Sequence, residues 1–254
     1  MGMKDDDTLD VEGAESGEDR EAREEPGKRT PLAQVVAAHL RDMIAQNELA
    51  PGARVRERSI ARQLSVSRTP MREALRILAA ERLVELLPNR GAVVSKPSPK
   101  DVKDLLSVLA SLESLAGEQA AVNASDDELA EIRALHFEML ATFERGDRLA
   151  YFKLNQAIHR AIVAASHNAA LIELHAQTNA RLYRVRYQSN LNNAQWPTAI
   201  EEHETILEAL CARDAEALAR ILRGHLGSTW AKVKERLEAE APDDADQSER
   251  PDEW

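Results

Sequence analysis

Two short amphipathic segments within residues 59–78 constrain the fold of this chain more than any other feature. Each carries apolar residues at helical spacing, and only the polar stretch Ser65, Val66 and Ser67 separates them. Pro70 suits the first turn of the second helix, where its missing N–H costs no hydrogen bond. Two helices joined by so short a turn predict a helix-turn-helix, whose second helix enters the DNA major groove.

The flanking segments extend this motif. Residues 32–44 have the periodicity of an amphipathic helix, and residues 82–87 and 92–95 are β-rich. The turn-forming residues Pro88 to Gly91 separate the last two segments. Three helices followed by a two-stranded hairpin predict a winged helix-turn-helix.

Charge is distributed unevenly along the chain. The net charge of the whole chain, -11, argues against DNA binding, but the charge of each region must be counted separately. Residues 30–97 hold eleven Arg and Lys against six Asp and Glu, whereas residues 1–29 hold eleven acidic against five basic side chains. The acidic ends, residues 1–29 and 240–254, have the composition of disordered tails. The predicted DNA-binding domain, residues 30–97, is therefore locally basic, as phosphate contacts require.

From residue 98 to 239 the periodicity is helical throughout. Ser125 followed by Glu128 forms a capping box that begins the second of these helices, and Asp147 begins the third. We expect a mainly α protein: an N-terminal winged helix-turn-helix and a C-terminal all-α bundle of about six helices.

A single cysteine excludes a disulfide framework and favours a reducing compartment. Cys211 lies among apolar residues, so we expect a buried structural thiol. No apolar run approaches the ~18 residues of a membrane span, and the first residues are acidic rather than basic and apolar. These features predict a soluble cytoplasmic protein.

Three histidines of the helical region occupy positions where an apolar residue is expected. They are His159, His203 and His225, and Asn155 lies one helical turn before the first. A single histidine of this kind is usually a hydrogen-bonded core residue. Three on separate helices are satisfied together by one metal ion, and imidazole suits Zn²⁺ or Ni²⁺. Spacing alone leaves both interpretations open, because distant helices must converge.

The N-terminal motifs resemble those of GntR-family transcription regulators: Pro51-Gly52, Arg56-Glu57-Arg58, the stretch from Leu64 to Leu75, and Asn89-Arg90-Gly91. Arg68 and Arg72 lie at the start of the second helix, and this position predicts that they contact guanine. Ser67 and Thr69 lie beside them and are predicted to contact phosphates. The resemblance implies the same base-reading role for Arg68 and Arg72. It adds Arg58 from the preceding helix, and Arg90 and Gly91 in the wing near the minor groove.

The histidine motifs resemble the FCD effector domain of the FadR-type branch of that family. The resemblance implies a metal held by the positions of Asn155, His159, His203 and His225, with a small organic acid as effector. Two positions depart from the family pattern. Asn155 stands where many members have aspartate, and Leu109 stands where members commonly have an arginine for the effector carboxylate. Arg181 and Arg184 are candidate substitutes for that arginine, and solvent-facing charge is the alternative for both.

One winged domain reads too few base pairs for genomic specificity, so we expect a homodimer on a palindromic operator. The prediction is an effector-responsive regulator, with repression as the family's default, and not an enzyme. Three alternatives remain: a regulator for which the metal itself is the signal, a three-histidine metalloenzyme, and a constitutive architectural protein.

Overall fold

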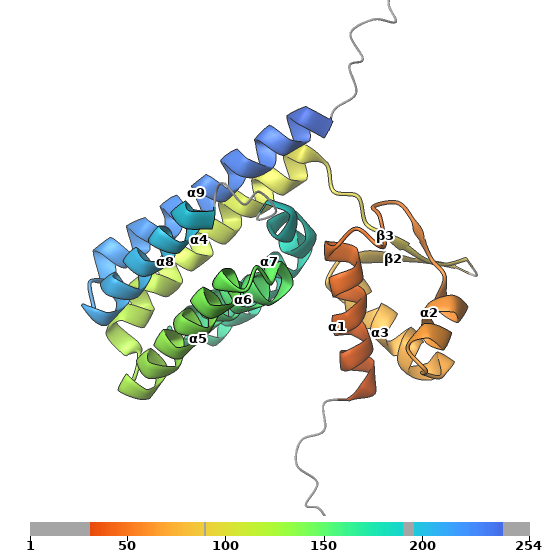
Figure 1. The fold of residues 1–254 in the computed structure, drawn as a ribbon, viewed down its shortest axis with the longest axis horizontal. Helices are drawn as coiled ribbons and strands as arrows, with labels where there is room; N and C mark the ends of the chain where they lie inside the picture. Colours follow the sequence, from red (N-terminus) through yellow and green to blue (C-terminus); the bar gives the residue numbers. More distant parts are fainter. Residues whose placement is uncertain (1–30, 89, 190–195, 241–254) are drawn as a thin grey trace, which may run out of the picture. The chain divides into compact units, whose positions relative to one another are not determined.

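The computed structural model describes residues 31–88, 90–189 and 196–240. Within these ranges a small α/β region precedes a helical bundle (Figure 1). The helices are α1 Leu32–Ala45, α2 Glu57–Gln63, α3 Arg68–Ala80, α4 Pro99–Asn123, α5 Asp126–Glu144, α6 Arg148–Ala165, α7 Ala169–Ser189, α8 Trp196–Cys211 and α9 Ala215–Glu240. The strands are β1 Arg54–Val55, β2 Val84–Leu87 and β3 Gly91–Val94. The predicted tails, residues 1–29 and 240–254, lie outside the described residues except for Glu240.

Helices α1 to α3 and the three strands form the winged helix-turn-helix. Helix α3 turns its apolar stripe into the core, as its spacing predicts; the buried residues are Met71, Ala74, Leu75 and Leu78. The sheet order is β1-β3-β2, and both pairs are antiparallel. The predicted two-stranded wing therefore gains a third strand. Two residues, Arg54 and Val55, are too few to show a period in the sequence.

The six helices α4 to α9 form the bundle, as predicted, with α4 and α9 packed side by side (Figure 1). Gly117 of α4 faces α9 at their contact. A Cβ atom at this position would lie 2.5 Å from Leu222 Cδ1 and 3.1 Å from Leu218 Cγ. The missing side chain thus permits the close approach of the two helices.

Side-chain caps fix where three of these helices begin. Ser98 and Ser125 each form a capping box, with Asp101 and Glu128 as their respective partners. Asp147 caps α6 by accepting a hydrogen bond from the backbone N–H of Ala150. Such caps satisfy N–H groups that have no partner within the helix.

Helix α1 of the winged helix-turn-helix packs against α6 and α7 of the bundle. Ala45, Phe152 and Tyr187 form a small apolar cluster there. Asp42 receives Lys153 Nζ at 2.5 Å and the Tyr183 hydroxyl at 3.2 Å. The two helices that contact α1 therefore also supply residues of the site described below.

Cys211 is exposed, so the prediction of a buried thiol is wrong. It is the last residue of α8, and Arg133 Nη2 lies 3.4 Å from its sulfur. The described helices include none with the length and apolarity needed to span a membrane.

Candidate functional site

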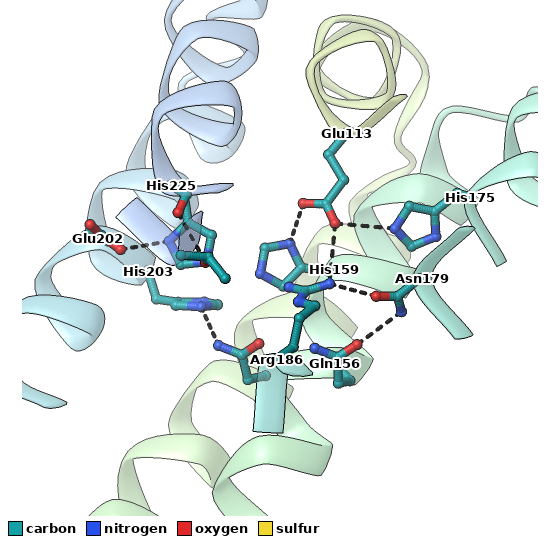
Figure 2. A network of polar contacts seen from close by, with 11 residues as sticks. Glu113, Gln156, His159, His175, Asn179, Arg186, Glu202, His203 and His225 are labelled. Carbon is teal, nitrogen blue, oxygen red and sulfur yellow. Dashed lines mark hydrogen bonds and ion pairs between the residues drawn. The ribbon is translucent and has the colours of Figure 1, made fainter. Parts of the chain in front are cut away.

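The three predicted histidines converge inside the bundle (Figure 2). His159 comes from α6, His203 from α8 and His225 from α9, and each side chain offers a nitrogen within 4.8 Å of the other two. The residues are 1%, 1% and 8% exposed. Residues from three separate helices thus form one buried cluster of potential metal ligands.

Two of these imidazoles have a carboxylate at the nitrogen that faces away from the cluster. His159 Nδ1 lies 2.7 Å from Glu113 Oε2, in ion-pair contact but not aligned as a hydrogen bond. His225 Nδ1 is hydrogen-bonded to Glu202 Oε2 at 2.6 Å. A carboxylate at one ring nitrogen fixes the tautomer and leaves the other nitrogen, Nε2, with its lone pair for a metal. Glu202 precedes His203 in the sequence yet supports His225, which only the packing of α8 against α9 reveals.

Asn155 completes the cluster, because it lies one turn before His159 on the same face of α6. Its side-chain amide is 2.7 Å from His203 Nε2. Rotating this amide by 180° exchanges Nδ2 and Oδ1 with little change in shape. In that orientation Oδ1 faces the histidines as a neutral oxygen ligand.

A second layer of buried polar side chains begins at Glu113. Its Oε1 lies 3.2 Å from His175 Nε2 and 3.6 Å from Arg186 Nη1. Arg186 also donates to Asn179 Oδ1 at 2.6 Å, and Asn179 donates to Gln156 Oε1 at 2.9 Å. No sequence motif singled out His175, Asn179, Arg186 or Gln156. The sequence signal that could have found them is the one that found the three histidines: a polar residue at a helical position where an apolar residue is expected.

Burial controls the charge state of this cluster. It lowers the pKa of His159 to about 4, despite the opposing effect of Glu113, and it lowers the pKa of His203 well below the ordinary value. Burial also acts to raise the pKa of Glu113, but His159, His175 and Arg186 outweigh it and hold that pKa well below its usual range. Burial therefore disfavours protonation of His159 and His203, and Arg186 places a positive charge beside Glu113.

These features fit a divalent metal. Three buried nitrogens of the cluster, His159 Nδ1, His159 Nε2 and His203 Nδ1, have no hydrogen-bond partner among the described residues. Unpaired buried polar atoms are costly, and a metal would relieve that cost where imidazole nitrogens converge. Three histidines and an amide oxygen would hold the ion, and an ion that takes five or six ligands would keep a position open for a further ligand.

The two predicted effector arginines do not join this cluster. Arg181 and Arg184 line a different cavity, together with residues of α1, β2 and the segment before α4. Leu109, at the family's usual arginine position, is fully buried in the apolar core. The arginine that reaches Glu113 is Arg186.

The predicted DNA contacts lie on the surface. Arg58, Arg68 and Arg72 line one shallow hollow between α2 and α3. The Arg72 side chain is 71% exposed, and its Nε lies 3.9 Å from Glu57 Oε2. These three arginines can therefore reach a DNA duplex without being withdrawn from the core.

The remaining predicted contacts lie at the N-terminus of α3 and in the wing. Ser67 is the N-cap of α3, but its side chain makes no capping hydrogen bond, and it is exposed with Thr69. Such a helix N-terminus suits a phosphate. Arg90 is exposed at the turn, and Gly91 adopts φ +78°, a conformation that favours glycine.

Comparison with known proteins identifies both regions. Residues 32–94 match the family described as bacterial regulatory proteins, gntR family, and residues 104–228 match the FCD domain. A probable D-xylose utilization operon transcriptional repressor of Paenarthrobacter nicotinovorans is 33% identical over 197 residues, covering 76% of this chain and 86% of that protein. The chain belongs to the GntR family. It is a DNA-binding transcription regulator with an FCD effector domain, as the sequence motifs indicated.

Two other relatives agree with this assignment. The HTH-type transcriptional repressor RspR of Escherichia coli K12 is 26% identical over 206 residues, covering 81% of this chain and 90% of that protein. The structure of E. coli McbR/YncC superimposes with a TM-score of 0.73 at 25% identity, over 82% of this chain and 100% of that one. The matched families and relatives are transcription regulators, so the metalloenzyme alternative is not supported.

Proposed function

We propose that this GntR-family regulator is a repressor whose affinity for its operator depends on a small organic acid bound at a divalent metal in the FCD domain. One observation carries the proposal. Three buried imidazoles share one centre, and carboxylates contact two of them from outside. Two curated relatives are named as repressors, which supports repression rather than activation.

Asn155, His159, His203 and His225 would hold the ion, with Zn²⁺ or Ni²⁺ expected from the ligand types. An acid is the favoured ligand because Lys232 lines a recess beside Asn155 and His225, and the ion would add its own positive charge there. Asn155 brings no charge, so the centre would retain more of the ion's positive charge than one with an aspartate. That excess charge favours an anionic ligand.

Metal analysis of the purified protein tests the centre. We expect about one divalent ion per chain in the wild type, and loss of most of it in the His203→Ala variant. His167→Ala is the matched control, because His167 is exposed and pairs with Glu128 outside the cluster. Equal metal content in all three proteins would contradict the proposal.

Operator titration tests the response. Each candidate acid is added to metal-loaded protein, and operator affinity is measured by fluorescence anisotropy. A coupling free energy of ~1–3 kcal/mol is typical of such regulators. If affinity follows metal concentration but no acid, the ion itself is the signal, which is the alternative reading of the same site.

The operator-binding form would be a homodimer, so that two winged domains read a palindrome. Three apolar residues of α4, spaced by seven, support a dimer through the helical domain: Val108, Leu115 and Val122 are 50%, 41% and 71% exposed. The DNA contacts proposed are Arg58, Ser67, Arg68, Thr69, Arg72, Arg90 and Gly91. Sedimentation of the wild type and of Val122→Asp tests the dimer; an unchanged molecular mass would exclude this face.

A further inference from the structure

A cavity of about 330 Å³ lies between the DNA-binding region and the bundle, apart from the histidine cluster. It is formed by the end of α1, the start of β2, the segment that leads into α4, and two helices of the bundle. The lining residues that matter here are four cations, two acids and an apolar floor. Cavities of this size at domain junctions are common ligand sites.

Positive charge exceeds negative charge around this cavity. Its cations are Arg82, Lys96, Arg181 and Arg184, and its acids are Glu85 and Asp101. Asp101 is already engaged, since its carboxylate accepts hydrogen bonds from the Ser98 N–H at 3.0 Å and the Ser98 hydroxyl at 2.6 Å. Four cations against two acids leave a surplus of two positive charges, which favours an anion.

The floor of the cavity is apolar. Leu83 and Val84 of the β2 segment, together with Ile44, are 2–5% exposed, and Leu105 and Val185 border them from α4 and α7. An inorganic ion would leave the partly exposed Leu105 and Val185 side chains against water. An anion with a compact apolar body would cover the floor and place its charge among the arginines.

DNA phosphate is the competing anion, and the geometry disfavours it. The arginines proposed to read bases lie at the start of α3, whereas Arg82 lies two residues beyond its last residue, Ala80. A helix of 13 residues is about 20 Å long, so the cavity lies at the far end of the recognition helix. A DNA phosphate backbone is also polar and charged, so contact with an apolar floor would not stabilise it.

We propose that this cavity is a second ligand site, which takes a small carboxylate with an aromatic or branched apolar body. The ligand would contact β2, the Lys96 segment, α4 and α7 at once, and so restrict how the DNA-binding region moves against the FCD domain. Arg181 and Arg184 then bind an anion here rather than at the metal. The proposal goes beyond the proposed function and does not rest on the metal centre.

Calorimetric titration of the full-length protein with benzoate tests it. We expect saturable binding, about tenfold weaker binding in the double variant Arg181→Gln, Lys96→Gln, and unchanged binding in Arg145→Gln. Both residues of the double variant are exposed, so the fold should persist, and thermal unfolding checks this. Arg145 is an exposed arginine outside the cavity. Benzamide, which lacks the charge, and acetate, which lacks the apolar body, should bind more weakly than benzoate.

Two results would overturn the site. If the double variant binds benzoate as tightly as the wild type, the ligand site lies elsewhere. If the wild type binds benzamide as tightly as benzoate, the negative charge of the ligand has no role. Weaker operator binding in the double variant, with benzoate binding unchanged, would instead assign these cations to DNA. Metal content, measured on the same samples, should not change in the double variant, so failure of the metal centre and failure of this site are distinguishable.

Discussion

The two halves of this regulator carry their functional side chains in opposite environments. In the DNA-binding region they are exposed arginines within one short stretch of sequence, and Arg72 is 71% exposed. In the FCD domain they are buried polar groups brought together from separate helices, with Glu113, His159 and His203 each 1% exposed. An exposed side chain can be removed without disturbing the fold, whereas a buried network contributes to stability and function together.

The strongest test of this contrast removes the charge at the centre of the buried network. Glu113→Ala would leave Arg186 as an uncompensated buried charge, so we expect a loss of ~3–5 kcal/mol in the free energy of unfolding. Urea denaturation followed by circular dichroism measures it. Glu118→Ala, an exposed glutamate on the same helix, should change stability by less than ~0.5 kcal/mol. Similar losses in both variants would show that Glu113 does not balance Arg186.

The matching test removes an exposed arginine. Arg72→Ala should weaken operator binding by ~1–3 kcal/mol and relax the preference at one base, with the free energy of unfolding nearly unchanged. Its contact with Glu57 at 3.9 Å is screened by solvent and adds little stability. Arg76→Ala, on the same helix, should weaken binding to all sequences alike. Binding with undiminished base preference in Arg72→Ala would refute its role.

A smaller effect tests whether the bundle depends on its helix caps as well as its core. Ser125→Ala removes the hydroxyl that accepts from the Glu128 N–H, and should cost ~1 kcal/mol of stability. Ser98→Ala should cost about as much at the start of α4, because that helix has the same capping box. Ser107→Ala, an exposed position inside α4, is the control, and a loss equal to that of the caps would contradict the capping role.

The smallest expected effect is a pH dependence at the start of α5. Hydrogen bonds from the Ser125 backbone, then from His167 and the Ser125 hydroxyl, lower the pKa of Glu128 from 4.5 to about 2. Because the folded pKa is depressed, this stabilisation is complete above about pH 4.5 and is lost as the pH falls toward 2. The stability difference between wild type and Glu128→Gln should therefore shrink over that range. Thermal unfolding at several pH values measures it, and a constant difference would refute the assignment.

The order of the helices, the winged motif and the three inward histidines could be predicted from the sequence. Each depends on local periodicity or on a cap such as Ser125, and these act over a few residues. The third strand escaped prediction because Arg54 and Val55 carry no period of their own. Cys211 was misplaced because apolar neighbours do not reveal that a residue ends its helix at the surface.

The sequence by itself determined the family, the reading helix and the identity of the candidate metal ligands, since these are carried by short motifs. Only the tertiary structure decided which groups support those ligands. Glu113 reaches His159 from α4, and Glu202 reaches His225 from the neighbouring helix, over separations that no local pattern spans. The tertiary structure likewise placed Arg186, rather than Arg181 or Arg184, beside the histidine cluster. Helix packing sets these contacts, because side chains that are far apart in the sequence become neighbours when their helices pack, and their shapes and charges then decide which of them interact.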